Sequence, residues 1–345
     1  MDNRRSPKDL SLASASRGMD LLLYRDEEFD PNFFYHSGVD IDNCFLLVKG
    51  AGEKNRKGQK ILFTSKMNEA LARETFGSKG KGRVLVYERD LKILEKHIRR
   101  RRLLVDMSSL SASMAARLGK VCRLTDETER LTQMRAAKRR DEVDKIRKAA
   151  KLTHEILASL DFSAAKTEIG LKSQILMKTL EMDAEPAFEP IVSTDPNTRF
   201  PHYSPGTRKL GKMVMVDMGV MYRHYRSDLT RMFFLERSTL LETQYEKLQY
   251  ICYSIIDSLH EHETGDEVTK YAERLLKKAG FPPMIHSLGH GIGLEVHEAP
   301  RLNLRFKDDI SAGMTMAIEP AFYLSRYGMR HEETVYFDGK RARIL

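Results

Sequence analysis

Two aspartates close together in the chain have the chemistry to hold a metal ion. They lie in residues 214–231, VMVDMGVMYRHYRSDLTR, where apolar residues alternate up to Asp217 as in a half-buried strand. Gly219 indicates a bulge or turn, and Asp228 falls on the return strand of a predicted pair. Buried carboxylates repel each other, and a bound cation reverses that cost. Taken alone, this stretch is more simply interpreted as a hairpin with two surface aspartates. The rest of the chain must decide between that interpretation and a metal site.

A second group of metal-binding side chains follows near the C-terminus, in segments that are typical of strands. A Gly-rich segment and two apolar segments supply imidazoles and carboxylates, namely His286, His290, His297, Glu319, Glu332 and Glu333. Each residue alone is more often structural or solvated. Together, carboxylates with one imidazole suit a pair of divalent ions such as Mn, Co, Zn or Fe. Two ions about 3.5–4 Å apart can share a hydroxide, a strong nucleophile at neutral pH.

The elements before these residues alternate between strand and helix patterns. Periodicity predicts strands that include FFYHSGVD (33–40), NCFLLVKG and QKILFTS, with helices at residues 66–77 and 89–101, and so a small α/β domain. A charged helical segment follows at about 125–160, and its later part has an apolar stripe that should dock on a second domain. We therefore predict an α/β (α+β) fold class, with an N-terminal domain over 1–125, a helical linker over 126–140 and a second domain over 141–345.

Composition narrows the class of protein. The 345 residues are 41% hydrophobic and 31% charged, which is typical of a globular protein, and we find no apolar run long enough to span a membrane. The basic, Ser-rich residues 1–18 lack the apolar core of a secretory signal, and three distant cysteines indicate no disulfide framework, so we expect a cytoplasmic protein. The net charge of +9 is spread along the chain, and the run 99–102 fits a solvated junction. We expect neither a nucleic-acid partner nor a membrane partner.

Five motifs in a fixed order make the chain recognisable. These are FEPIV…N…PHY, VDMGVMYRHYRSDLTR, HSLGHGIGLEVHE, IEPAFY and MRHEETV, and the N-terminal NFFYHSGV agrees with them. In this order the motifs resemble the pita-bread metallopeptidases, specifically the Xaa-Pro dipeptidase (prolidase) and Xaa-Pro aminopeptidase group. The resemblance implies a pita-bread catalytic domain after a small N-terminal domain. It also implies a metallo-exopeptidase that hydrolyses the bond between an N-terminal residue and proline by attack of a metal-bridging hydroxide.

The resemblance implies a set of five ligands for two divalent ions. Mn or Co is expected before Zn or Fe. Asp217 would chelate one ion, Asp228 and Glu332 would bridge both, and His290 and Glu319 would hold the second. Glu332 is preferred to its neighbour because it stands two residues after an arginine, as in the Arg-x-Glu of the family.

The resemblance also implies the residues that handle the substrate. His202 and His297 would hydrogen-bond the scissile carbonyl and the developing oxyanion, and Glu319 would move a proton to the leaving nitrogen. His286, Tyr323 and Arg330 match positions around the substrate pocket. A proline-containing peptide is the expected substrate and a homodimer the expected assembly.

The sequence departs from the family at His224, His331, the EPAFY segment and the STDP run, and none of these departures removes a metal ligand. The two histidines bear on the shape of the pocket and its pH dependence. Other functions stay open: a catalytically silent binding or chaperone protein, a creatinase-like hydrolase, or a methionine aminopeptidase. The complete ligand set disfavours the first two, and the PHY motif and additional N-terminal domain disfavour the third. One fold hosts several functions, so fold alone does not separate them.

Overall fold

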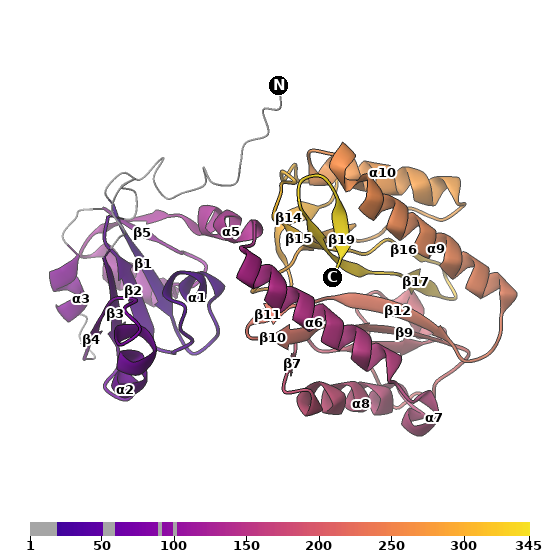
Figure 1. Cartoon of the computed structure of the whole chain (residues 1–345), viewed down its shortest axis with the longest axis horizontal. Coiled ribbons are helices and arrows are strands. Elements are labelled where there is room, and N and C mark those ends of the chain that lie inside the picture. Colours follow the sequence, from indigo (N-terminus) through magenta and orange to yellow (C-terminus); the bar gives the residue numbers. More distant parts are fainter. Residues whose placement is uncertain (1–18, 51–58, 89–91, 99–101) are drawn as a thin grey trace. The chain divides into compact units, whose positions relative to one another are not determined.

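The structure, a computed structural model, describes residues 19–50, 59–88, 92–98 and 102–345. The chain divides into two compact units, Met1–Arg135 and Ala136–Leu345 (Figure 1). The N-terminal tail 1–18 and residues 99–101 of the basic run lie outside the described residues. Helix α5 (Thr128–Ala136), within the segment predicted as a linker, ends where the first unit ends.

The first unit is built on one six-stranded sheet in the order β4-β3-β2-β1-β5-β6. Its strands are β1 (Asp20–Arg25), β2 (Cys44–Val48), β3 (Lys60–Thr64), β4 (Arg83–Val86), β5 (Arg102–Val105) and β6 (Arg123–Asp126). The helices are α1 (Pro31–Ser37), α2 (Glu69–Ala72) continued by a π-helix (Arg73–Gly77), α3 (Lys92–His97), α4 (Ala112–Gly119) and α5. The strands β1, β2 and β3 are almost wholly buried, as in a sheet covered on both faces, which agrees with the predicted α/β architecture.

The prediction of a strand over residues 33–40 is wrong, because Pro31–Ser37 form helix α1. Asp30 caps this helix by accepting a hydrogen bond from the Phe33 N–H, and Pro31 occupies the first turn, where its missing N–H costs nothing. Gly38 ends the helix with φ of 65°. The aromatic run favoured a strand by composition, but the capping residues on either side determine the helix.

The second unit places antiparallel strands between two helix pairs (Figure 1). Its helices are α6 (Arg140–Ala158), α7 (Phe162–Ala165), α8 (Glu168–Glu181), α9 (Thr239–Ser258) and α10 (Gly265–Lys278). Its strands are β7 (Glu185–Pro186), β8 (Ile191–Thr194), β9 (Met213–Met218), β10 (Val220–Tyr222), β11 (Tyr225–Arg226), β12 (Leu229–Phe234), β13 (Gly289–Gly291), β14 (Glu298–Leu302), β15 (Thr315–Ile318), β16 (Ala321–Tyr323), β17 (Gly328–Arg330), β18 (Glu333–Phe337) and β19 (Ala342–Ile344).

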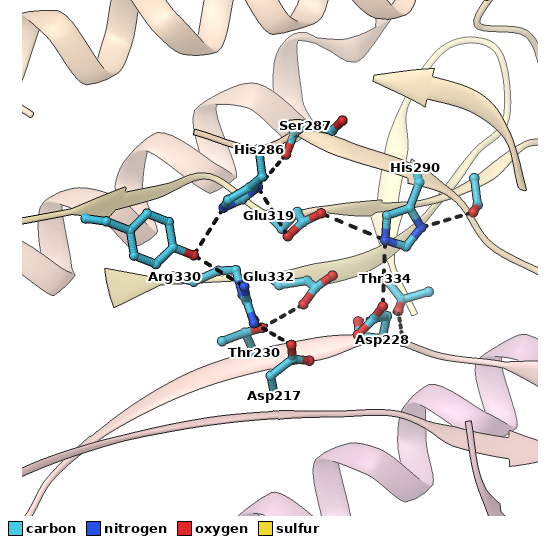
Figure 2. A network of polar contacts seen from close by, with 12 residues as sticks. Asp217, Asp228, Thr230, His286, Ser287, His290, Glu319, Arg330, Glu332 and Thr334 are labelled. Carbon is cyan, nitrogen blue, oxygen red and sulfur yellow. Dashed lines mark hydrogen bonds and ion pairs between the residues drawn. The ribbon is translucent and has the colours of Figure 1, made fainter. Parts of the chain in front are cut away.

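Two apolar cores hold these layers together. Helices α9 and α10 pack on the five-stranded sheet β14-β13-β15-β18-β19 through residues such as Ile255, Leu276 and Met316. Helices α6 and α8 pack on strands β8 to β10 through residues such as Ile156, Ile175 and Val216. The site described below lies between these two layers (Figure 2). Among the described residues, no helix is long and apolar enough to cross a bilayer.

The predicted strand pair over residues 214–231 exists, but its tight turn is not at Gly219. Strands β9 and β12 pair in antiparallel fashion, with Thr230 opposite Asp217. The chain between them forms a small hairpin, β10–β11, that turns at Arg223 and His224 with φ of 49° and 70°. Turn composition missed this position because neither residue is typical of left-handed backbone. The hairpin adds residues to the connection and leaves Asp228 directly before β12.

Candidate metal centre

Two neighbouring strands bring the predicted aspartates into the interior. Asp217 lies in β9 and Asp228 just before β12, and they are 7% and 5% exposed. Glu332, 2% exposed, directly precedes β18, and its N–H donates to the Thr230 carbonyl at 3.3 Å. All three carboxylates enter the same space between the layers (Figure 2).

His290 enters from the middle of β13, in the five-stranded sheet that also contains β18, and so faces the strands that carry the two aspartates. Glycines flank it on both sides, and a Cβ at either Gly289 or Gly291 would lie 2.0 Å from a carbonyl oxygen of a neighbouring strand. The glycines therefore permit the close strand approach that places the His290 ring in the site. This explains the Gly-rich composition that the sequence shows around this residue.

The ligand atoms lie at separations that a shared cation would bridge. Asp228, His290 and Glu332 each offer an atom within 4.8 Å of the other two. His290 Nε2 lies 3.7 Å from Asp228 Oδ2 and 3.9 Å from Glu319 Oε1. These distances are too long for hydrogen bonds. For comparison, two ligand atoms that each bind the same ion at about 2.1 Å lie roughly 3 to 3.5 Å apart. Glu319 follows β15 and so completes the second layer's contribution.

The carboxylates of this cluster are buried and repel one another. Burial, followed by repulsion from Glu332 and Asp217, raises the pKa of Asp228 well above its usual value. Burial, followed by Glu319 and Asp217, does the same to the pKa of Glu332. Buried carboxylates in such a group are stabilised in their ionised form by a bound cation.

Two carboxylate oxygens of the cluster lack hydrogen-bond partners. Asp217 Oδ1 and Asp228 Oδ1 are buried and accept no hydrogen bond. The two oxygens are therefore available as ligands. Burial lowers the pKa of His290 to about 3, so its imidazole is neutral and can bind a metal. The residues thus fit divalent cations.

Arg330 lies on β17 and partly compensates the negative charge of the carboxylates. Its guanidinium forms an ion pair with Asp217 Oδ2, donates from Nε to Thr230 Oγ1 at 2.9 Å, and donates to the Tyr323 hydroxyl at 3.3 Å. Thr230 in turn donates to Glu332 Oε2 at 2.7 Å. Through these contacts Arg330 and Thr230 orient Asp217 and Glu332, two predicted metal ligands, although neither Arg330 nor Thr230 is itself a predicted ligand (Figure 2).

The remaining predicted residues line the same region. His286 lies with Nδ1 3.7 Å from Glu319 Oε2 and Nε2 3.1 Å from the Tyr323 hydroxyl. The His297 ring lies edge-on to His290 at a centroid distance of 4.3 Å. His202 is exposed in the loop after β8. Burial is the main cause that lowers the pKa values of His286 and His297, and His202 adds to it.

Sequence reasoning missed two threonines that hold the ligand strands in register. Thr230 links Arg330 to Glu332, and Thr334 accepts from the Asp228 N–H at 3.0 Å while donating to the Asp228 carbonyl at 2.8 Å. Each threonine stands two residues after a predicted ligand, on the same side of its strand. That alternation is the signal that would have identified them.

Comparisons with known proteins identify the family of the region that carries this site. The profile described as metallopeptidase family M24 matches residues 144–338. A peptidase of Methanocaldococcus jannaschii is 33% identical over 220 residues, covering 60% of this chain and 62% of the relative. An Xaa-Pro dipeptidase of Pyrococcus furiosus is 28% identical over 224 residues, covering 62% of this chain and 64% of the relative. The matched region thus spans less than two thirds of either curated relative.

A solved structure confirms the predicted fold. The prolidase from Pyrococcus horikoshii OT3 superposes with a TM-score of 0.83 at 22% identity, covering 95% of this chain and 93% of that one. At this identity the likeness establishes the fold. The resemblance to the pita-bread group is therefore confirmed for both the sequence family and the architecture.

Proposed function

The chain belongs to metallopeptidase family M24, and from this premise we propose that it is a metal-dependent exopeptidase that cleaves the bond between an N-terminal residue and proline. The observation that carries the proposal is the convergence of Asp228, His290 and Glu332, all buried, within 4.8 Å of one another. A group of buried carboxylates with a neutral imidazole suits hydrolytic metals.

Five residues would hold two divalent ions, and the proposal keeps the ligand set Asp217, Asp228, His290, Glu319 and Glu332. The buried, unbonded oxygens of the two aspartates support this set. When bound, divalent ions supply Lewis-acid polarisation of a carbonyl and activation of water at neutral pH.

The chain's own residues would then handle protons and developing charge. Glu319 would accept a proton and return it to the leaving nitrogen. The imidazoles of His297 and His202 would donate hydrogen bonds to the oxygen that gains charge. Burial, aided by His202, lowers the pKa of His297 and keeps its ring neutral.

The proline preference is supported by a relative whose name is Xaa-Pro dipeptidase. His286 and Tyr323 are hydrogen-bonded beside Glu319 and would border the substrate. Arg330 keeps its proposed place near the substrate's proline side through its contact with Tyr323, although its strongest partner here is Asp217.

Hydrolysis assays on matched peptides would test the proposal. Protein loaded with Mn or Co should cleave Met-Pro or Met-Pro-X peptides, and chelation followed by metal return should remove and restore activity. Metal analysis should find two ions per chain. Comparison of the dipeptide with the longer peptide would distinguish a dipeptidase from an aminopeptidase.

Two results would contradict this function. Good hydrolysis of Met-Ala with Met-Pro untouched would move the chain to a methionine aminopeptidase function. Full metal loading without hydrolysis of any peptide would favour the silent binding or chaperone function. Asp228→Asn, which removes a proposed bridging charge, serves as the inactive control in both assays.

Several finer expectations stay predictions. The expected preference for Mn or Co over Zn or Fe is tested by measuring activity after the protein is loaded with each ion. The homodimer is tested by sedimentation, and the cytoplasmic location by cell fractionation. Weak, salt-sensitive binding to DNA would agree with the expectation that nucleic acid is not a partner, and tight sequence-selective binding would contradict it.

A further inference from the structure

We infer that Glu168 is a positioning residue for the proposed reaction, because its buried carboxylate fixes the loop that carries His202. The inference rests on the proposed function, since it assigns Glu168 a task in the same reaction. Glu168 is the first residue of α8 and is 0% exposed. No sequence motif singled it out, because its partners lie far along the chain.

The Glu168 carboxylate accepts hydrogen bonds from both ends of one loop. Oε1 accepts from the Thr194 N–H at 2.9 Å and from Asn197 Nδ2 at 3.4 Å. Oε2 accepts from the Tyr203 hydroxyl at 2.9 Å and from the Gly206 N–H at 3.2 Å. The loop therefore begins and ends on a single carboxylate.

The loop also closes on itself around His202. Asn197 Nδ2 donates to the Tyr203 hydroxyl oxygen at 2.9 Å, which ties together the residues that precede and follow His202. The His202 side chain is exposed, so its position depends on the backbone that these neighbours hold. Because Tyr203 is adjacent to His202, the hydrogen bond from Tyr203 to Glu168 has the most direct effect on the position of His202.

The opposite side of the loop contacts the hairpin β16–β17. Arg199 donates to the Ser325 carbonyl at 2.8 Å, and the Gly328 N–H donates to Thr198 Oγ1 at 3.2 Å. This hairpin carries Tyr323 and Arg330. Glu168 thus holds the loop against α8, while the hairpin holds it beside the proposed substrate residues.

The chemistry of the contacts requires an ionised carboxylate. Two backbone N–H groups and two side-chain donors meet four acceptor positions, which a carboxylate supplies and an amide does not. Glu168→Gln would set an NH₂ group against one of these donors and loosen the loop. A displacement of a reacting group by about 1 Å can cost on the order of a hundredfold in rate.

A double-mutant cycle between Glu168 and His202 tests the inference. Glu168→Gln should lower kcat at least about tenfold, with metal content unchanged, and should cost less than about twofold more in a His202→Ala background. Tyr203→Phe should show the same pattern more weakly. Glu181→Gln, at the exposed far end of α8, is the matched control and should behave as the wild type.

Independent losses from Glu168→Gln and His202→Ala would overturn the inference, as would a metal deficit that accounts for the whole defect. Unchanged kcat in both Glu168→Gln and Tyr203→Phe would also overturn it. If Glu168→Gln does not fold, Tyr203→Phe alone decides by the same criteria.

Amide hydrogen exchange gives a readout that does not depend on turnover. Faster exchange confined to residues 194–206 in Glu168→Gln supports the inference, and exchange equal to that of the wild type contradicts it. A wild-type protein that hydrolyses no peptide would end the proposed function, whereas the exchange result would still decide whether Glu168 holds the loop.

Discussion

Arg330 and Asp217 form a buried ion pair, and the arginine is 3% exposed. The same guanidinium donates to Thr230 and Tyr323, so one cation connects a proposed metal ligand with the proposed substrate side. Because a planar guanidinium supplies several donors in fixed directions, an ammonium group does not replace it.

Arg330→Lys should therefore weaken metal binding, because Asp217 loses the group that orients it. The expected loss is about 10- to 100-fold in metal affinity, measured by titration against a fluorescent chelator. Arg341→Lys, on the turn before β19, is the matched control. Unchanged metal affinity combined with a raised KM would instead place Arg330 on the substrate alone.

Asp228→Asn should abolish metal-dependent stabilisation without weakening the metal-free protein. Asp228 is surrounded by Glu332, Asp217 and Glu319, so neutralising it relieves repulsion. Wild-type protein should gain about 2.7 kcal/mol when the metal is present at a hundred times its Kd, and the variant should gain little. Thermal unfolding with and without metal measures both effects. A metal-free variant less stable than the metal-free wild type would contradict the proposed repulsion.

The strands that carry the proposed ligands were predictable from sequence because apolar runs stand beside each of them. An alternating run places Asp217 at a buried position of β9, and a continuous run ends just before the half-buried Glu319. The contacts between the two layers were not predictable. Thr230 and Arg330 are a hundred residues apart, and only the folded chain brings them together. The partners of Glu168 lie 26 to 38 residues further along the chain, so its contacts were not predictable either.

Local backbone errors have a different cause. Helix α1 was predicted as a strand because aromatic composition outweighed the caps at Asp30 and Gly38. The hairpin turn at Arg223 and His224 has left-handed backbone without Gly or Asn to mark it. In both places a capping or pairing interaction, and not the composition of the segment, determines the backbone conformation.

In the metal-free protein, Glu319 should make folding stability fall as the pH rises. Burial raises its folded pKa to about 7, above the ordinary value of 4.5, so the folded protein keeps a proton that the unfolded chain releases. This contribution is present below pH 4.5 and is lost as the pH rises through about 7. Each unit of pKa shift corresponds to about 1.4 kcal/mol.

Urea unfolding of chelated wild type and Glu319→Gln at about pH 5 and about pH 8 measures this effect. The comparison cancels the opposite contributions of His286 and His290, whose lowered pKa values reduce stability as the pH falls below 6.5. The wild type should lose more stability than the variant between the two pH values. Equal slopes for both proteins would contradict the prediction.

The buried pair Lys138–Glu298 should contribute strongly to stability beside the proposed catalytic His297. Lys138 Nζ lies 3.0 Å from Glu298 Oε2, with side chains 1% and 0% exposed. Lys138→Met would leave the carboxylate uncompensated and should cost about 3–5 kcal/mol in urea unfolding. Lys138→Met with Glu298→Gln should recover part of that loss. A double variant no more stable than Lys138→Met would show that lost packing causes the defect.

His297→Ala should lose most turnover while keeping the metal ions. The His297 ring packs edge-on to His290 with centroids 4.3 Å apart, so it reaches the ligands without needing to join them. Burial and His202 lower its pKa, and a neutral ring can still donate one hydrogen bond to a developing oxyanion. Removing one such donor typically costs on the order of a hundredfold or more in kcat. We expect a loss of this size on Met-Pro peptides.

Metal analysis of the same His297→Ala preparation separates the two explanations for a slow enzyme. Full metal content with a lowered kcat and a little-changed KM assigns His297 to charge stabilisation in the transition state. His262→Ala, at the end of the helical turn after α9, provides a histidine control away from the site and should keep wild-type kcat. Metal loss in proportion to the lost activity would instead make His297 a support for His290, because the two rings are in contact.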